Sequence, residues 1–159
     1  AEAGGGRNEK SIKTKIGMNT IESTIKEIAE KYFSGFSYVF DTWDRADTKL
    51  EKLEYPAIVC VMPVSGQTTI KGGRVKDTEN IALAFLDIAP RGADGEDNEE
   101  VYTRMKVAGA KFLQAINETR KFEPITDAYY EVICERLSTI VSGIMYSLQI
   151  EQTVGGCSV

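Results

Sequence analysis

Residues 57–62 form a run of apolar side chains between Tyr55-Pro56 and Pro63. The run is rich in valine and isoleucine, whose β-branched side chains favour strands. Because its apolar character is continuous rather than alternating, both faces of the strand are expected to be covered by other elements. This pattern predicts a central strand in a layered fold. Pro63 is expected to end its hydrogen-bonded ladder, since proline has no N–H to donate.

Two further segments have the spacing of amphipathic helices. In the first, one apolar stripe is formed by Ile21, Ile25, Ile28 and Tyr32. Asn19 and Glu22 resemble a capping box at its start, and Gly35 is suited to end it. In the second, one face carries Val101, Met105, Ala108, Phe112 and Ile116. Its expected cap is Asp97 or Asn98.

The remaining segments indicate strands and connections. Residues 36–42 have the aromatic and β-branched composition of a short strand, and residues 44–54 form a polar connection. Gly72-Gly73 permits a bend, so we expect a hairpin before a core strand at 81–88. Apolar residues alternate over 144–150, as in a half-buried antiparallel strand. Residues 125–137 fit a helical stripe as well as a twisted strand, and both readings stay open.

These elements predict one α+β domain over residues 18–153. We expect an antiparallel β-sheet with two main helices packed on one face and a protruding β-hairpin arm. A hydrophobic content of 42% and a charged content of 27% are ordinary for a globular chain. Residues 1–17 are glycine-rich and mildly basic, and we favour an added flexible leader before Met18 over a functional basic arm. Residues 154–159 are expected to form a loose tail.

Composition excludes several kinds of chemistry. The 159-residue chain has no histidine, so neither a Ser-His-Asp nor a Cys-His arrangement can form within it. The three widely spaced cysteines form neither a disulfide framework nor a CxxC metal site, which favours a reducing compartment. A net charge of −5 argues against sequence-specific nucleic-acid binding, and no apolar run approaches the ~20 residues of a membrane helix. We expect a non-enzymatic protein without cofactor or metal.

Carboxylates and glycines are the remaining candidates for a site. Asp41, Asp44 and Asp47 lack the glycine and distal glutamate of a calcium loop. Neither glycine-rich stretch, 72–74 or 92–95, has the order that holds phosphate between a strand and a helix. Cys60 and Cys134 are expected to be inert, because a thiol nucleophile would have no histidine base.

Two clusters of opposite charge are candidates for self-assembly. The expected hairpin carries the basic residues Lys71, Arg74 and Lys76. The start of the second helix carries Asp94, Glu96, Asp97 and Glu99. Acidic residues there also offset the helix dipole, and basic residues on a hairpin also keep a surface soluble. Complementary patches at different places on one chain favour head-to-tail contacts between copies, which close into a ring when the rotation permits.

The order of elements resembles that of the small tail-terminator and tail-completion proteins of tailed bacteriophages, which join a tail tube to the head connector. The resemblance covers residues 18 to about 152. Its first part is the opening helix near Tyr32-Phe33, the entry of Tyr55-Pro56 into the strand 57–62, and an arm at residues 66–78 before the strand 81–88. Its second part is the helix 101–116 and the segment Val141-Ser142-Gly143-Ile144 before the strand 146–150.

This resemblance implies a structural subunit rather than an enzyme. Such subunits form a ring, usually of six copies, that ends the tail tube of a phage or prophage and presents a surface to the head or neck. The implied partners are copies of itself and the tail-tube and head-connector proteins. The implied location is the bacterial host cytoplasm during assembly and then the virion tail.

Two other functions stay open. The first is a module that binds a small molecule or a peptide, in which an apolar pocket is lined by Trp43, Tyr129, Tyr130 and Tyr146. The second is an enzyme without histidine that uses paired carboxylates, such as Asp41 with Asp87, in a shared cleft.

Overall fold

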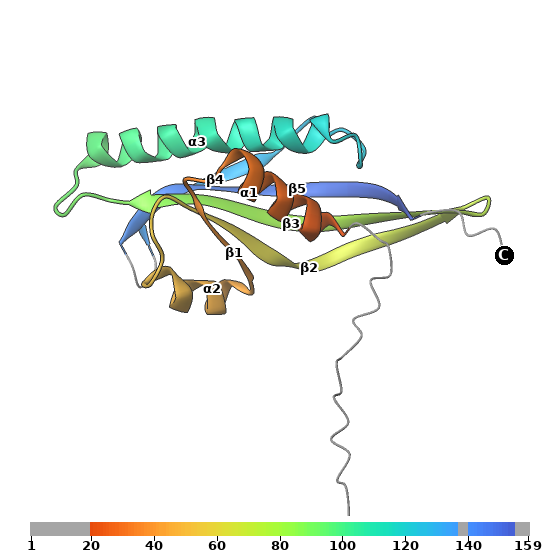
Figure 1. Ribbon diagram of the computed structural model, residues 1–159, viewed down its shortest axis with the longest axis horizontal. Helices are drawn as coiled ribbons and strands as arrows, with labels where there is room; N and C mark the ends of the chain where they lie inside the picture. The colour runs from red at the N-terminus through yellow and green to blue at the C-terminus, as the bar shows by residue number, and fades with distance from the viewer. Residues whose placement is uncertain (1–19, 137–139, 155–159) are drawn as a thin grey trace, which may run out of the picture.

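The computed structural model describes residues 20–136 and 140–154 (Figure 1). Its elements, in chain order, are α1 (Ile21–Tyr32), β1 (Ser37–Asp41), α2 (Trp43–Leu50), β2 (Ala57–Lys71), β3 (Arg74–Ile88), α3 (Gly95–Glu118), β4 (Tyr129–Arg136) and β5 (Val141–Val154). The predicted α+β class is confirmed. Residues 1–17, Asn19 and residues 155–159 of the expected tail lie outside the described residues, whereas Val154 is the last residue of β5 rather than part of a loose tail.

The five strands form one sheet in the order β1-β2-β3-β5-β4. β2 pairs with β3, β3 with β5 and β5 with β4, all antiparallel, whereas β1 pairs with β2 in parallel. The prediction of a purely antiparallel sheet is therefore wrong. The physical reason is α2, which carries the chain from the end of β1 back to the start of β2, as a parallel connection requires.

The helices cover both faces of the sheet rather than one. α1 and α3 lie on one face, here called the α1/α3 face, and α2 lies on the other, the α2 face (Figure 1). We expected no helix within residues 44–54. The structure has α2 there instead. The fully buried residues of α2 are Ala46 and Leu50, which are spaced i,i+4 and pack against Val59 and Leu86 of the sheet.

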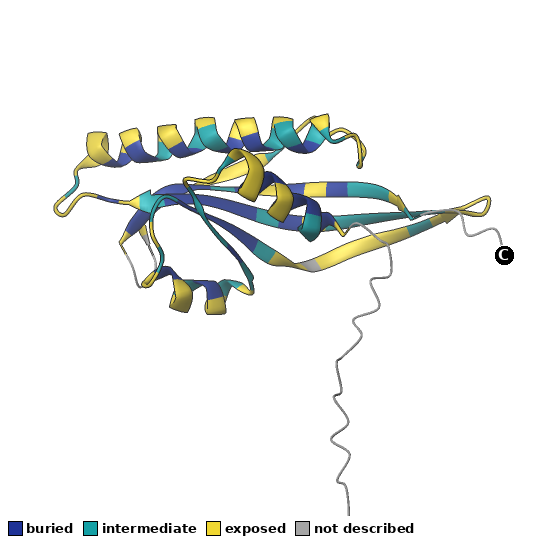
Figure 2. Ribbon diagram, viewed as in Figure 1, coloured by how far each residue is buried: buried dark blue, intermediate teal, exposed yellow. Residues whose placement is uncertain are grey.

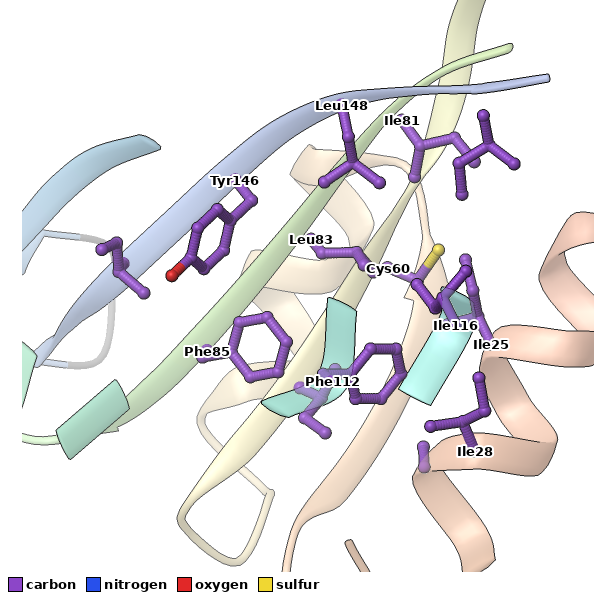
Figure 3. Close-up of a cluster of buried hydrophobic side chains, with 14 of the residues drawn as sticks. Ile25, Ile28, Cys60, Ile81, Leu83, Phe85, Phe112, Ile116, Tyr146 and Leu148 are labelled. Atoms are coloured by element: carbon purple, nitrogen blue, oxygen red, sulfur yellow. The ribbon is translucent and has the colours of Figure 1, made fainter. Parts of the chain in front are cut away.

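The prediction that residues 57–62 form a central strand covered on both faces is confirmed. Ile58 and Cys60 point into the cluster beneath α1 and α3, whereas Val59 points towards α2. The larger cluster is centred on aromatic rings from three elements (Figure 3). The Phe85 ring makes edge contacts with Phe112 of α3 at 5.6 Å and with Tyr146 of β5 at 6.1 Å, measured between ring centroids.

Helix ends differ from the sequence-based expectations. Thr20 caps α1 by accepting a hydrogen bond from the backbone N–H of Ser23 at 3.1 Å, and the helix ends at Tyr32 rather than near Gly35. α3 begins at Gly95, well before the first residue of its predicted apolar stripe, Val101, and its cap is Asp94 rather than Asp97 or Asn98. Asp94 Oδ1 accepts from the Asp97 N–H at 2.9 Å, and Asp97 Oδ2 accepts from the Asp94 N–H at 3.1 Å.

β2 and β3 are both longer than predicted. β2 continues past Pro63, because its pairing with β3 shifts register between Val61 and Ser65 and so accommodates a residue without an N–H. The two strands are joined at Gly72 and Gly73, whose φ angles of +54° and +78° are readily available only to glycine. The open assignment of residues 125–137 is decided for 129–136, which form the strand β4, whereas residues 125–128 belong to no helix or strand.

Residues 65–80 and 149–154, here called the arm, extend past the helices (Figures 1 and 2). The arm has three strands rather than the two of a hairpin, because β5 pairs with β3 as far as the row Val75↔Val154. Its side chains are mostly exposed or half-buried, with Ile70 at 73% exposure near the turn. Except for Ile150, which is fully buried in the cluster beneath α1 and α3, the arm therefore rests on strand pairing rather than on burial in the core.

A buried polar chain ties the start of α3 to β4 and β5. Ser142 Oγ donates to Asn98 Oδ1 at 2.6 Å and accepts from the backbone N–H of Glu135 at 3.1 Å. Asn98 in turn donates to the carbonyl of Asp94 at 2.9 Å. Glu135 has a φ of +46°, at the point where the β4–β5 register shifts. The Ser142 hydroxyl thus holds the irregular part of β4 and the start of α3 in place.

Ser142→Ala is expected to lower the free energy of unfolding by about 1–3 kcal/mol, because it leaves a buried carboxamide oxygen and a backbone N–H without this partner. Equilibrium urea unfolding measures the change. Ser147→Ala is the matched control, since Ser147 is exposed on the same strand. Equal stability of the two variants would contradict the role assigned to Ser142.

Candidate functional site

The basic residues predicted for self-assembly lie on the arm. Lys71 and Arg74 are exposed and flank the turn between β2 and β3. Lys76 is already engaged within the chain, because its Nζ lies 2.7 Å from Glu151 and 3.9 Å from Glu123. The hydrogen bond to Glu151 raises the pKa of Lys76 above its ordinary value. Lys71 and Arg74 therefore form the part of this cluster that best suits an external contact.

The acidic residues lie at the other end of the molecule. Asp94, Glu96, Asp97 and Glu99 are all exposed at the start of α3. Asp94 and Asp97 serve in the capping box of the helix, so Glu96 and Glu99 carry charge without that structural role. Figure 1 shows the start of α3 and the arm turn at opposite ends of the long axis. The structure does not bring the two clusters together within one chain.

The carboxylates considered for catalysis are held in separate ion pairs. Asp41 lies 2.7 Å from Lys49 Nζ, and Asp87 lies 3.1 Å from Arg104 Nη1. The hydrogen bond from Lys49 holds the pKa of Asp41 below its usual range, the opposite of what a general acid needs. Through the strand register Asp41 is level with Ala82 of β3 rather than with Asp87. These two groups do not share a cleft.

Two of the cysteines, Cys60 and Cys134, lie within the described residues. Burial raises the pKa of the Cys60 thiol to about 12, so the thiolate that a nucleophile needs is not formed near neutral pH. Cys134 is exposed on β4. Within residues 20–136 and 140–154, no three His, Cys, Asp or Glu side chains are grouped as metal ligands.

The four aromatic residues predicted to line one pocket do not do so. Tyr129 and Tyr130 point to opposite faces of the sheet because they are adjacent on a strand. Tyr130 packs edge-on against Tyr146 beside α3, whereas Trp43 packs in the cluster beside α2. Only Tyr129 lines a hollow of about 720 Å³, where Val61, Ala82 and Ser147 of neighbouring strands also lie.

A second hollow, of about 670 Å³, runs along the edge strand β1 and was not predicted. It lies between α1 and β1, and its walls include Phe36, Tyr38 and Phe40 together with Glu22, Lys26 and Glu30. The Tyr38 hydroxyl donates to Glu22 Oε1 at 3.3 Å, and burial raises the pKa of Tyr38. The alternating aromatic residues of 36–40 were visible in the sequence, but the hollow depends on where α1 lies.

Comparisons with known proteins do not identify a family. No protein-family model matches the chain, and no curated protein has significant similarity to its sequence. In the described residues, none of the helices is both long enough and apolar enough to span a bilayer.

Proposed function

We propose that this protein is a structural subunit that assembles into a ring at the end of a phage or prophage tail tube and joins the tube to the head or neck. The observation that carries the proposal is that the two ends of the molecule expose opposite charges. An exposed basic turn lies at the tip of an extended arm, and exposed acidic residues lie at the opposite end of the long axis. A ring of such subunits has one basic rim and one acidic rim.

The two rims give the proposed ring different neighbours on its two sides. Opposite charges steer association and select the correct partner face. The two clusters lie too far apart to meet within one chain. A contact between them therefore forms between two copies, joined end to end, with Lys71 and Arg74 of one copy against Glu96 and Glu99 of the other. In a tail, the same rims meet the tube protein on one side and the head connector on the other.

The absence of histidine and the ion pairing of Asp41 and Asp87 support a non-enzymatic role. A binding module is the second candidate. It is favoured by the hollow beside Tyr129, which has the volume of a small-ligand site. A strictly monomeric protein that binds a peptide or small molecule there would favour this second function.

A charge-swap experiment tests the proposed end-to-end contact. Lys71→Glu/Arg74→Glu makes both ends acidic, and Glu96→Lys/Glu99→Lys makes both ends basic. Each variant alone is expected to need at least about tenfold higher concentration to associate end to end, because like charges then face each other. An equimolar mixture of the two is expected to regain association. Sedimentation velocity at low salt measures both effects.

Lys111→Glu on α3 is the control, since it reverses an exposed charge away from both ends. It is expected to associate as the unchanged protein does. If both swapped variants also associate like the unchanged protein, the charged ends are not contact surfaces.

A further inference from the structure

We propose that β4 of one copy pairs antiparallel with β1 of the next, so that the ring contains one continuous sheet. This inference rests on the proposed function, because it names the side-by-side contact of the ring. It concerns the two edges of the sheet, whereas the charged clusters lie at the two ends of the long axis.

The outer edge of β4 is open. β4 is the last strand of the sheet, and no described segment pairs with its outer side. Over residues 129–132 its exposed side chains are apolar or aromatic apart from Glu131: Tyr129 is 84% exposed, Tyr130 48% and Val132 37%. Folded proteins usually protect such an edge with charged side chains, proline, a β-bulge or a covering segment. The register shift of β4 lies beyond Ile133, so residues 129–132 form a regular, largely apolar edge that can pair with another chain.

β1 is the matching edge on the other side of the sheet. The strand register places Tyr38, Ile58, Phe85, Ile144 and Val132 in one row across all five strands. The neighbouring row begins at Phe40 of β1 and ends at Tyr130 of β4. The two edge strands therefore lie at the same level of the sheet, and they run in opposite directions.

A closed ring repeats its subunit by rotation, without a rise along the ring axis. When this axis runs along the strands, rotation brings β4 of one copy to β1 of the next at an unchanged level. Antiparallel pairing then follows without any shift of register. Val132 comes opposite Tyr38 of the neighbouring copy, and Tyr130 comes opposite Phe40. Aromatic and β-branched pairs of this kind are favourable across strands.

The shapes of the two edges are complementary on the α1/α3 face. Tyr130 and Val132 are the exposed side chains of β4 on this face, since Tyr130 packs against the core residue Tyr146. On the β1 side, the same face holds the hollow lined by Phe36, Tyr38 and Phe40. Side-by-side copies thus place two projecting apolar side chains at a hollow with aromatic walls.

Charges are complementary on both faces. Beside β4 on the α1/α3 face lies Lys106, whose Nζ is 3.2 Å from the Tyr130 hydroxyl. The hollow along β1 that it would approach carries Glu22 and Glu30, together with one cation, Lys26. On the α2 face, β4 presents the exposed Glu131, and Lys49 of α2 lies beside β1, bound to Asp41. Each edge thus offers the counter-charges of the other.

Val132→Asp tests the inference by placing a carboxylate in the proposed contact. Because burying an unpaired charge is costly, association between copies is expected to weaken about 100-fold in sedimentation equilibrium. Val107→Asp is the matched control, since Val107 is 52% exposed on α3 and is expected to leave association unchanged. Circular dichroism establishes that both variants remain folded.

Zero-length carbodiimide cross-linking of the unchanged protein provides a second readout that does not depend on a variant. Mixed nitrogen-14 and nitrogen-15 copies are expected to yield a mixed-isotope conjugate of Lys49 with Glu131, because within one chain Lys49 of α2 lies beside β1 and Glu131 lies on β4 at the opposite edge of the sheet. An assembled protein that lacks this conjugate and is insensitive to Val132→Asp would overturn the edge pairing and leave the proposed function standing. A protein that stays monomeric at every concentration would overturn the proposed function itself.

Discussion

Gly143→Ala is expected to lower the free energy of unfolding by about 3 kcal/mol or more, a large part of the stability of a domain this size. Gly143 is buried in β5, where it faces Leu86 of β3 and Ile133 of β4. A Cβ atom at this position would overlap the carbonyl oxygen of Phe85 and lie 3.0 Å from the Cα of Leu86. Both are backbone atoms, so no rotation of a side chain relieves the overlap.

Thermal and urea unfolding measure this loss. Gly35→Ala is the control, because a Cβ there meets nothing within 4 Å and the residue lies in a turn. We expect Gly35→Ala to unfold within about 0.5 kcal/mol of the unchanged protein. A Gly143→Ala variant as stable as the Gly35→Ala control would show that β3 and β5 can separate at this point without loss.

Phe112→Ala is the second change with a large expected effect, a loss of about 3–5 kcal/mol. The Phe112 side chain is fully buried, and its ring centroid lies 5.6 Å from that of Phe85 (Figure 3). Its centroid also lies 5.2 Å from that of Phe33. It connects α3 to β3 and to the end of α1, so its removal leaves a cavity where three elements meet.

The measurement is again equilibrium unfolding in urea. Tyr32→Ala serves as the comparison, since this aromatic side chain is 61% exposed and little packing is lost with it. A loss below about 1 kcal/mol in Phe112→Ala would mean that the core closes over the cavity or that α3 does not pack as described.

Features that depend on local pattern could be predicted from the sequence. Continuous apolarity located the central strand β2, because burial on both faces removes any need for polar residues over its first half. α2 was missed because its apolar residues, Trp43, Ala46 and Leu50, are few in a short polar segment, although their spacing is helical. The choice between helix and strand could not be made for β4, because the exposed residues Tyr129, Tyr130 and Val132 suit the repeat of a helix as well as that of a strand.

The charge of the candidate surfaces could be predicted from the sequence, but their positions in the fold could not. Lys71 and Glu96 were recognisable as members of clusters, yet only the fold shows that these clusters lie at opposite ends of the molecule. The equal level of β1 and β4 follows from the register of three intervening strands, which are long-range pairings that no single segment encodes. The hollow under α1 likewise depends on tertiary packing.

The proposed ring requires that the protein form a closed assembly of defined size. Light scattering coupled to size exclusion gives the absolute mass of the purified protein across a wide range of concentrations, at low and at high salt. We expect a discrete species whose mass is a whole multiple of 17.6 kDa, six times for the proposed ring, and we expect end-to-end joining of such species to be lost at high salt. A mass of 17.6 kDa under every condition would contradict the proposed ring.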